Sequence, residues 1–390
     1  MKNLFENTKT AFLLKNNRQL LRAYLLFSIL KYRFLVKVLS SIALFFSRFR
    51  SPFNPLIKIS LFDHFCGGTT LKSCWKKIEE MKSYNVHSIL DFSVEAHQTE
   101  KHFEDSVKKK LLLINAIKNK KAIPFSVFKP TCLGRYGLFK KKSDNLILTP
   151  KELMEWDKII DRFDRVCNES VKQNIRVLID AEEKEVQEAI DQLALKMMEK
   201  YNNKDVFVYN TVQMYRHDRL LYLKNLIKKK KEKTLLGIKL VRGAYMEKER
   251  LIAKKSKAQS PICKNKKETD NNYDLAIDFL FDNLNKVNFF IATHNEKSTL
   301  KVLELMKIYK LENTDKRIWF GQLYGMSDQI TFNLAKKGYN VAKIVPFGPI
   351  NNLIPYLIRR AQENSSVVGQ SNRELLLIQT ERKRRKENNY

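Results

Sequence analysis

From about residue 85 onward, short runs rich in β-branched and aromatic residues alternate with longer stretches whose apolar residues recur at helical spacing. Eight such runs predict strands, at His87–Val94, Pro124–Pro130, Ile175–Asp180, Val206–Gln213, Leu236–Arg242, Asn288–Thr293, Arg317–Leu323 and Asn340–Pro346. The stretches between them predict helices, among them Pro150–Ser170, Glu183–Lys200, Asp270–Asn285 and Glu296–Tyr309. Thr149 and Pro150 are residue types typical of a helix N-cap and a first helical position.

Strands that alternate with helices imply a parallel sheet, and eight repeats fit closure into a (βα)8 barrel of the TIM type, in the α/β class. Several runs are almost continuously apolar, as expected for strands buried on both faces. The alternative is an open doubly wound sheet, which usually carries a glycine-rich turn after its first strand. Here Glu95-Ala96-His97 follows instead, and the chain has only 11 glycines and no GxGxxG. This argues against a Rossmann domain and against a Walker-type phosphate loop.

We therefore divide the chain into an N-terminal helical region (1–84), the barrel (85–370), and a C-terminal helix with a frayed basic tail (371–390). Ala11–Arg50 predicts amphipathic helices in addition to the barrel, either packed on the protein's own surface or lying on a membrane surface. Phe34–Phe46 is too short to span a bilayer.

The formal net charge is +31, from 73 Lys and Arg against 42 Asp and Glu, which would attract nucleic acid or an anionic membrane. Because the lysines are dispersed along the chain, we interpret the excess as solvated surface and expect no specific nucleic-acid partner. A basic nucleic-acid-binding protein is the rival from another class. The five cysteines show no CxxC spacing, which fits a reduced compartment, and the six histidines form no HExxH, so we predict no metal site.

Polar residues stand at the carboxyl ends of six predicted strands, where the active site of such a barrel lies. They are Lys129, Asp180, Gln213, Lys239 with Arg242, Thr293 with His294, and Gln322. Each has a plain structural alternative: Asp180 could cap the next helix, Gln213 could bridge strands, and His294 could be a core histidine. Unpaired polar groups are costly at buried strand ends, so the set together predicts a mouth that binds a polar ligand.

Arg359 and Arg360 are adjacent on the helix predicted after the eighth strand, about 100° apart around its axis. Guanidinium groups bind carboxylates through two parallel hydrogen bonds. Glu363 lies one helical turn away and can orient one of them. A solvated basic face is the alternative, but the position after strand eight favours a carboxylate clamp over the mouth.

These residues carry a resemblance to the proline dehydrogenases, closer to the mitochondrial-type branch than to the large bifunctional bacterial enzymes. The matching motifs are Lys239-Leu-Val-Arg-Gly-Ala-Tyr-Met-Glu-Lys-Glu-Arg250, Ala292-Thr-His-Asn295, Phe320-Gly-Gln-Leu-Tyr-Gly-Met326, Tyr356-Leu-Ile-Arg-Arg-Ala-Gln-Glu-Asn-Ser-Ser366, Val177-Leu-Ile-Asp-Ala-Glu-Glu183 and Lys129-Pro-Thr-Cys-Leu-Gly-Arg135. The resemblance runs from about residue 10 to 385.

The resemblance implies non-covalently bound FAD, oxidation of L-proline to Δ1-pyrroline-5-carboxylate, the first step of proline catabolism to glutamate, and electron transfer to a membrane quinone. It implies catalytic roles for Asp180 and Lys239. The implied substrate contacts are Lys129, Arg359, Arg360 and Tyr245, with Glu363 orienting an arginine. The implied FAD contacts are Ala181, Gln213, Arg242, Gly243, Ala244, Thr293 and His294.

The chain departs from the family at Ile344, where many members have a tyrosine that helps to reject hydroxyproline-like substrates. We also expect no aldehyde dehydrogenase domain, so that a separate pyrroline-5-carboxylate dehydrogenase would complete the pathway. The expected location is peripheral, on the cytoplasmic face of an inner membrane, or alternatively on the matrix side of the mitochondrial inner membrane. The rival enzyme is another flavin barrel such as a methylenetetrahydrofolate reductase.

Overall fold

A computed structural model describes the chain except for residues 1–2, 48–60, 93–97, 367–369 and 389–390. Its eight described strands follow one another in chain order around a closed barrel, which confirms the predicted fold. The strands are β1 (Val86–Phe92), β2 (Phe125–Phe128), β3 (Arg176–Ile179), β4 (Val208–Gln213), β5 (Leu236–Val241), β6 (Val287–Ala292), β7 (Ile318–Leu323) and β8 (Val341–Phe347). Each overlaps a predicted run, and the last two residues of the first run lie outside the described residues.

The described part of the chain forms the helices α1 (Thr8–Ala11), α2 (Asn17–Leu30), α3 (Arg33–Ser47), α5 (Asp63–Phe65), α6 (Leu71–Lys82), α7 (Glu100–Ile117), α8 (Tyr136–Ser143), α9 (Pro150–Lys172), α10 (Lys184–Tyr201), α11 (Arg219–Lys229), α12 (Met246–Lys255), α13 (Lys266–Asp282), α14 (Glu296–Ile308), α15 (Asp328–Lys336), α16 (Ile350–Ser366) and α17 (Gln370–Glu387). The Thr149 side chain accepts a hydrogen bond from Glu152 N and thereby caps α9, as predicted. The predicted N-terminal helices are confirmed as α2 and α3, and residues 48–50 lie outside the described residues.

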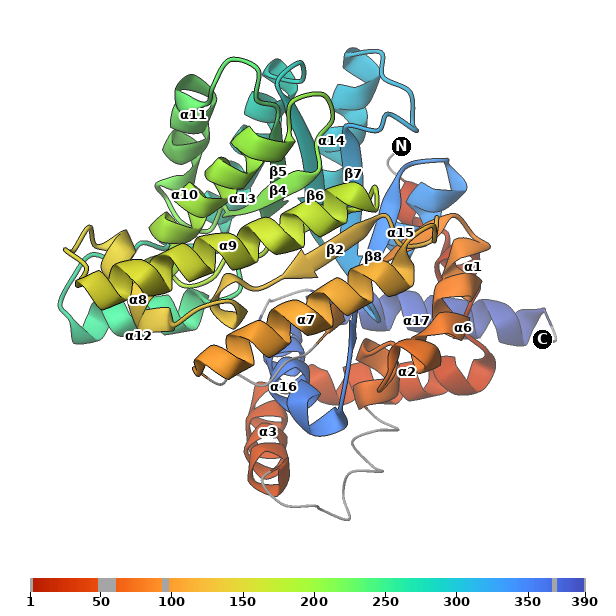
Figure 1. The fold of residues 1–390 in the computed structure, drawn as a ribbon. Helices are drawn as coiled ribbons and strands as arrows, with labels where there is room; N and C mark the ends of the chain where they lie inside the picture. Colours follow the sequence, from red (N-terminus) through yellow and green to blue (C-terminus); the bar gives the residue numbers. More distant parts are fainter. Residues whose placement is uncertain (1–2, 48–60, 93–97, 367–369, 389–390) are drawn as a thin grey trace. The chain divides into compact units, whose positions relative to one another are not determined.

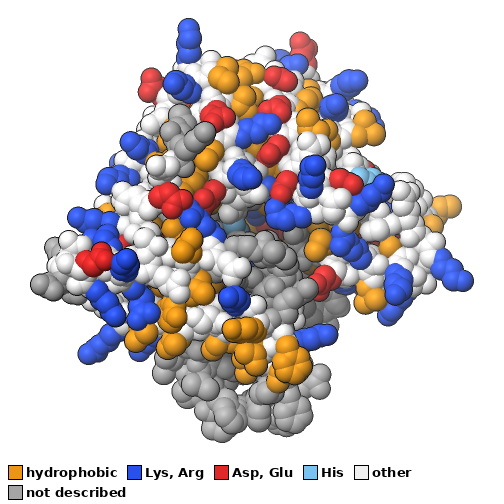
Figure 2. All heavy atoms as spheres, turned by 180° about the vertical axis from the view of Figure 1, so that it is seen from behind, with side chains coloured by type: hydrophobic (Ala, Val, Ile, Leu, Met, Phe, Trp, Pro, Cys, Tyr) orange, Lys and Arg blue, Asp and Glu red, His pale blue; other side chains and the backbone are white. Residues whose placement is uncertain are grey.

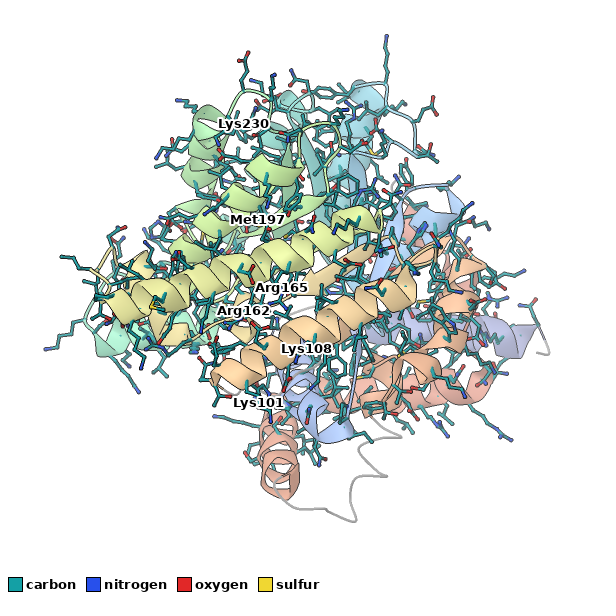
Figure 3. The ribbon with its side chains drawn as sticks, in the orientation of Figure 1. Lys101, Lys108, Arg162, Arg165, Met197 and Lys230 are labelled. Atoms are coloured by element: carbon teal, nitrogen blue, oxygen red, sulfur yellow. The ribbon has the colours of Figure 1, made fainter. Side chains whose placement is uncertain are left out.

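The chain divides into two compact units, one formed by residues 96–321 and the other by residues 1–95 together with 322–390. In the first, α7 and α9 lie side by side across β2 (Figure 1). Arg162 of α9 is almost fully buried, and its Nε donates to Glu104 of α7 at 2.7 Å. Arg165, one turn further, reaches the same carboxylate at 3.0 Å, and both arginines are labelled in Figure 3. These ion pairs hold the two helices together on the outside of the barrel.

Inside this unit, aromatic side chains from β2, β4, β6 and β7 pack together in the barrel interior. The Phe125 ring lies 5.7 Å from Tyr209, 5.3 Å from Phe290 and 5.0 Å from Trp319, measured between ring centroids. Strand β7 has glycine at 321, where a Cβ would come within 2.2 Å of the Phe290 ring. This layer separates the amino ends of the strands from their carboxyl ends, where the active site of such a barrel lies.

The other unit has its own apolar core, to which α2, α16 and α17 contribute. Its buried members include Phe12, Leu20, Ala23, Phe27, Leu30, Phe65, Leu353, Leu357, Leu377 and Ile378. Helix α2 packs along α17 and α3 packs against α16 (Figure 1). The N-terminal helices and the last two helices therefore support one another, although they are far apart in the sequence.

The region predicted as a C-terminal helix with a frayed basic tail is helical as far as Glu387, so its basic residues up to Lys386 belong to α17 and are not frayed. Arg384 and Arg385 both donate to the Glu381 carboxylate, which is fully buried. Arg385 also donates to the carbonyl oxygen of Lys15 at 2.8 Å. The basic residues are therefore used to fasten α17 to the N-terminal segment.

Elsewhere the positive charge is dispersed. Figure 2 shows lysine and arginine side chains spread over the face that it presents, with aspartates and glutamates among them. This distribution agrees with the interpretation of the net charge as solvated surface.

A buried ionic cluster in the unit of residues 1–95 and 322–390 was not foreseen from the sequence. Asp328, at the start of α15, accepts from Lys343 at 2.8 Å and from Lys15 at 2.5 Å. Glu374 of α17 accepts a hydrogen bond from Ser327 N at 2.5 Å. Burial and the nearby Asp328 raise the pKa of Glu374 to about 7, although Ser327 and the two lysines oppose the shift.

This raised pKa gives a prediction for stability. The folded protein holds the Glu374 proton more tightly than the unfolded chain, where the pKa is about 4.3. The contribution of Glu374 to the free energy of unfolding therefore falls as pH rises toward 7. The variant Glu374→Gln has no carboxyl group to ionise, so it does not lose stability in this way. The free energy of unfolding of the variant minus that of the wild type is expected to rise between about pH 4.5 and 7, by up to about 3 kcal/mol, and then to level off. Urea unfolding at several pH values measures this difference.

The matched control is Glu381→Gln on the same helix. Burial alone would raise the pKa of Glu381, but Arg384 and Arg385 outweigh it and lower the pKa to about 2. Its difference from the wild type should therefore stay constant over the same pH range. A Glu374→Gln difference that is equally flat would contradict the prediction.

Candidate active site at the barrel mouth

Three of the predicted residues meet in the unit of residues 96–321. Asp180 follows the end of β3, and its carboxylate lies between two lysines. Lys239 of β5 donates to Asp180 Oδ1 at 2.7 Å, and Lys129, which follows β2, donates to Oδ2 at 3.1 Å. The exposed fractions of these side chains are 7% for Lys239, 16% for Asp180 and 38% for Lys129. Residues from β2, β3 and β5 thus converge, which requires their side chains to face the barrel interior.

The electrostatics of this cluster follow from its two cations. Burial alone would raise the pKa of Asp180, but Lys239 and then Lys129 outweigh it and hold the pKa well below its usual range. The carboxylate is therefore ionised at neutral pH. The alternative in which Asp180 caps the next helix is excluded, because the N-cap of α10 is Glu183.

On β4, Gln213 is buried and its Nε2 donates to the backbone oxygen of Glu182 at 2.8 Å. It therefore bridges neighbouring strand ends, as its structural alternative proposed. Glu182 in turn accepts from the backbone and side chain of Thr131 at 2.8 and 2.7 Å. These bonds fix the ends of β2, β3 and β4 relative to one another. Ala181 is half-buried beside them.

Arg242, directly after β5, is held on three sides. Its guanidinium donates to Asp270 at 2.7 Å, to Thr293 Oγ1 at 2.8 Å and to Ser298 at 3.0 Å. It also lies 4.3 Å from the centroid of the Tyr273 ring. The structure thus brings Arg242 and Thr293, two of the predicted cofactor contacts, into direct contact with each other. Sequence reasoning missed Asp270 and Ser298, because they lie on helices and nothing in their local pattern marks them.

The segment after Arg242 runs open to solvent. Gly243 and Ala244 are exposed, and Tyr245 is half-buried at the start of α12. Gly243 has a φ of 131°, and a Cβ there would lie 2.5 Å from the Tyr215 ring. The glycine is therefore required by the left-handed backbone and by Tyr215, in addition to the close cofactor approach expected from the sequence.

His294 is half-buried and directly precedes Asn295, whose side chain caps α14 by accepting from Ser298 N at 3.1 Å. The sequence therefore places His294 between Thr293 and a helix start, on the same segment that reaches Arg242. Because Ser298 also bonds Arg242, this segment and the end of β5 form one hydrogen-bonded network.

Gln322 corrects the prediction of six polar strand ends at the mouth. Its Oε1 accepts from Thr331 of α15 at 2.7 Å, and the residue is 1% exposed. Successive side chains of a strand point to opposite faces, and it is Gly321 that faces the interior. Gln322 therefore faces the surrounding helices and was wrongly included.

The two arginines of the predicted clamp lie on α16, in the unit of residues 1–95 and 322–390. Arg359 is half-buried, and Arg360 is 8% exposed with its guanidinium 5.1 Å from the centroid of the Tyr356 ring. The side chain of Glu363 lies outside the described residues. Ile344 of β8 is half-buried and is paired with Ile89 of β1.

Comparison with known proteins gives a consistent family. Residues 74–373 match the family model of proline dehydrogenase. A carbapenem antibiotics biosynthesis protein, CarD, of Pectobacterium carotovorum is 32% identical over 82% of this chain and 83% of its own length. The mitochondrial proline dehydrogenase 1 of Dictyostelium discoideum is 30% identical over 86% of this chain and 66% of its own length. The human mitochondrial proline dehydrogenase 1 is 35% identical over 61% of this chain.

Solved structures resemble this chain in fold. The crystal structure of proline utilization A from Bdellovibrio bacteriovorus, inactivated by N-propargylglycine, matches with a TM-score of 0.71 at 20% identity. A bifunctional proline utilization A matches with a TM-score of 0.65 at 18% identity. The chain spans 34% and 33% of those two proteins, and 40% of the human relative.

Proposed function

The chain belongs to the proline dehydrogenase family, and we propose that it oxidises L-proline to Δ1-pyrroline-5-carboxylate with FAD as its cofactor and a membrane quinone as electron acceptor. The observation that carries this proposal is the cluster of Lys129, Asp180 and Lys239, an inward-facing ion-paired group at the carboxyl ends of β2, β3 and β5. Polar ligands bind at that end of a barrel. A barrel without a polar ligand would have no use for two cations and a carboxylate there.

The residues at the strand ends fit a flavin dinucleotide. A flavin ring offers mainly hydrogen-bond acceptors, and the strand ends supply donors in Lys239, Gln213 and Arg242. The exposed Gly243 and Ala244 leave the backbone open to a ligand. The proposed contacts of FAD are Ala181, Gln213, Arg242, Gly243, Ala244, Thr293 and His294. When bound, FAD would accept the hydride from the substrate.

Asp270 and Ser298 support this assignment through Arg242. A guanidinium held at 2.7, 2.8 and 3.0 Å by three partners has one fixed orientation, so it presents the same face to a ligand each time. Because Asp270 already neutralises part of its charge, Arg242 would orient a cofactor more than it would attract one.

The protein's own residues would bind and orient the substrate. We propose that Lys129, Arg359 and Arg360 bind the proline carboxylate, with Glu363 orienting an arginine and Tyr245 adjoining the ring. Three cations around one carboxylate fix the angle of the ring. Asp180 bonds both lysine ammonium groups and thereby fixes their positions relative to each other. Lys239, the more buried of the two, would stabilise negative charge that develops on the cofactor side.

The product is a cyclic imine, which opens to an aldehyde by hydrolysis. Two-electron oxidation of that aldehyde to glutamate would require a separate pyrroline-5-carboxylate dehydrogenase with its own electron acceptor. The first test of the proposal is the cofactor itself. Protein purified in its native state should be yellow and should release FAD on denaturation, in about one equivalent per chain. Colourless protein that takes up no added FAD would overturn the proposal.

We further propose that α2 and α3 rest on an anionic membrane surface, where a quinone would be accessible. Leu21, Leu25 and Ile29 of α2 are 43%, 54% and 42% exposed, on one face at helical spacing. On α3, Phe34 is 76% exposed and Leu39 50%. From Asn7 to Phe62 the chain has ten Lys and Arg and no Asp or Glu. Apolar side chains flanked by basic ones fit the interface of an anionic bilayer.

Among the residues that the structure describes, no helix is long and apolar enough to cross a bilayer. Contact through α2 and α3 would therefore be at the surface. The double variant Leu25→Glu with Phe34→Glu is expected to lower partitioning onto anionic vesicles at least about tenfold, because it removes two apolar side chains and adds two repelled charges. Flotation with anionic and with neutral vesicles measures the effect.

A matched control places the same change on another exposed residue. Ile308 of α14 is 69% exposed, so Ile308→Glu should leave partitioning unchanged. Equal flotation of the double variant, the control and the wild type would refute the membrane contact, without bearing on proline oxidation.

A further inference from the structure

Asp180 and Lys239 are separated by one strand, β4, and the residue between them, Thr211, is not among the proposed contacts of the substrate or the cofactor. Ile179 of β3 is paired with Asn210, so the next residues, Asp180 and Thr211, continue the same row. Thr211 is in turn paired with Lys239 of β5. The three residues therefore stand at one level on three adjacent strands, with Thr211 in the middle.

The Thr211 side chain faces the interior. Tyr209, two residues earlier on the strand, packs against Phe125 in the interior aromatic layer. Asn210 points the other way, because its Nδ2 donates to Asp191 of α10 at 2.8 Å and to Tyr222 of α11 at 3.0 Å. Side chains alternate along a strand, so Thr211 lies on the same face as the Lys239 to Asp180 ion pair.

The polar groups in this row are not fully satisfied by protein atoms. Thr211 is 4% exposed, and its hydroxyl has no hydrogen-bond partner among the described residues. The Lys239 ammonium has three N–H donors, and Asp180 is its one hydrogen-bond partner in the described part of the chain. Buried polar groups in native proteins are almost always hydrogen-bonded, to protein or to ordered water.

We infer that Thr211 positions Lys239 through one buried water molecule, which accepts a hydrogen bond from the Lys239 ammonium and donates one to the Thr211 hydroxyl oxygen. The water would satisfy a second N–H of the ammonium, and it would give the Lys239 side chain a second hydrogen-bonded contact in addition to Asp180. Thr211 is thus a positioning residue that acts through Lys239. Its effect on catalysis rests on the proposed function, whereas the water itself does not.

If Thr211 had a purely structural role, its variants would behave differently. Threonine is favoured in strands because it is branched at Cβ, and valine has the same shape. If shape alone mattered, Thr211→Val would behave like the wild type and Thr211→Ser would be the poorer variant. If the hydroxyl matters, the order is reversed.

The test compares Thr211→Val and Thr211→Ser with the wild-type holoenzyme. With proline, Thr211→Val is expected to lower kcat roughly three- to tenfold, the range of one lost hydrogen bond, with KM changed less than about twofold. Thr211→Ser should retain most of the wild-type kcat. High-resolution crystal structures of the wild type and Thr211→Val supply the second readout: a water within hydrogen-bond distance of Thr211 Oγ1 and Lys239 Nζ, present in the wild type and lost in the variant.

The outcomes separate the two claims. A wild-type structure without this water, or a Thr211→Val enzyme as fast as the wild type while Thr211→Ser is slower, would overturn the inference. A wild type that carries the water and loses it in Thr211→Val, yet oxidises no proline, would refute the proposed function and leave the water-mediated positioning of Lys239 in place.

Discussion

Arg360→Ala is expected to lower kcat/KM for proline by about 30-fold to several thousand-fold, the effect of removing one partner of a buried charge pair, which costs 2 to 5 kcal/mol. Arg359→Ala should act in the same direction. The cause is the loss of a guanidinium that binds a carboxylate through two hydrogen bonds. Because the proposed FAD contacts lie on other residues, the FAD content should remain that of the wild type.

Arg360→Lys sharpens this expectation. Lysine keeps the positive charge and loses the planar fork, so it should recover only a part of the activity. The matched control is Arg373→Ala in the same unit, where a surface arginine pairs with Glu6 at 2.7 Å and little change is expected. Steady-state kinetics and FAD content, measured on the wild type and on these four variants, test the prediction. Equal losses of proline and FAD affinity in Arg360→Ala would contradict the proposed clamp.

Asp180→Asn is expected to have the second large effect, on both stability and activity. It leaves Lys239, 7% exposed, without its anionic partner. Breaking a buried ion pair costs about 3 to 5 kcal/mol, and the partial exposure of Lys129 reduces this to about 2 to 4 kcal/mol of unfolding free energy. Because the two lysines would lose their common anchor, kcat/KM for proline should also fall at least about 100-fold.

The pH dependence follows from the direction of the Asp180 pKa shift. The pKa of Asp180 is lower in the folded protein than its value of about 3.9 in the unfolded chain. The carboxylate therefore stabilises the fold at every pH above about 3.9, and this stabilisation is lost as pH falls through the folded pKa. The deficit of Asp180→Asn should therefore be constant from about pH 5 to 8 and shrink only in acid. Urea unfolding over this range measures it.

Asp161→Asn is the matched control, since Asp161 is 62% exposed and pairs with Arg165 on the surface of α9. A loss under about 1 kcal/mol is expected there. If Asp180→Asn were as stable as this control, the ion-paired cluster would not have the electrostatic role assigned to it.

Much of the fold could be predicted because the signals are local. The eight strands are short runs rich in β-branched and aromatic residues, several of them almost continuously apolar, and their predicted boundaries agree with the structure within a few residues. Thr149 and Pro150 fix the start of α9 through chemistry confined to four residues. The common position of Lys129, Asp180 and Lys239 could be predicted because the active site of a (βα)8 barrel lies at the carboxyl ends of its strands.

The remaining features depend on side-chain direction or on distant parts of the chain. Gln322 was misplaced because one residue of register decides whether a side chain faces the interior or the helices. Asp270 and Ser298 reach Arg242 from helices, at separations of 28 and 56 residues. The burial of Asp328 between Lys15 and Lys343 joins segments more than 300 residues apart, which no local pattern could indicate.

Anaerobic titration of the purified holoenzyme with L-proline tests the central claim most directly. We expect that proline bleaches the flavin absorbance, that added quinone restores it, and that Asp180→Asn and Arg360→Ala proteins with full FAD content bleach far more slowly. Hydroxyproline is the comparison substrate, because the family resemblance predicts a tyrosine that rejects such substrates at the position of Ile344. If the flavin stayed oxidised at a saturating concentration of proline, the proposed oxidation of proline would be refuted.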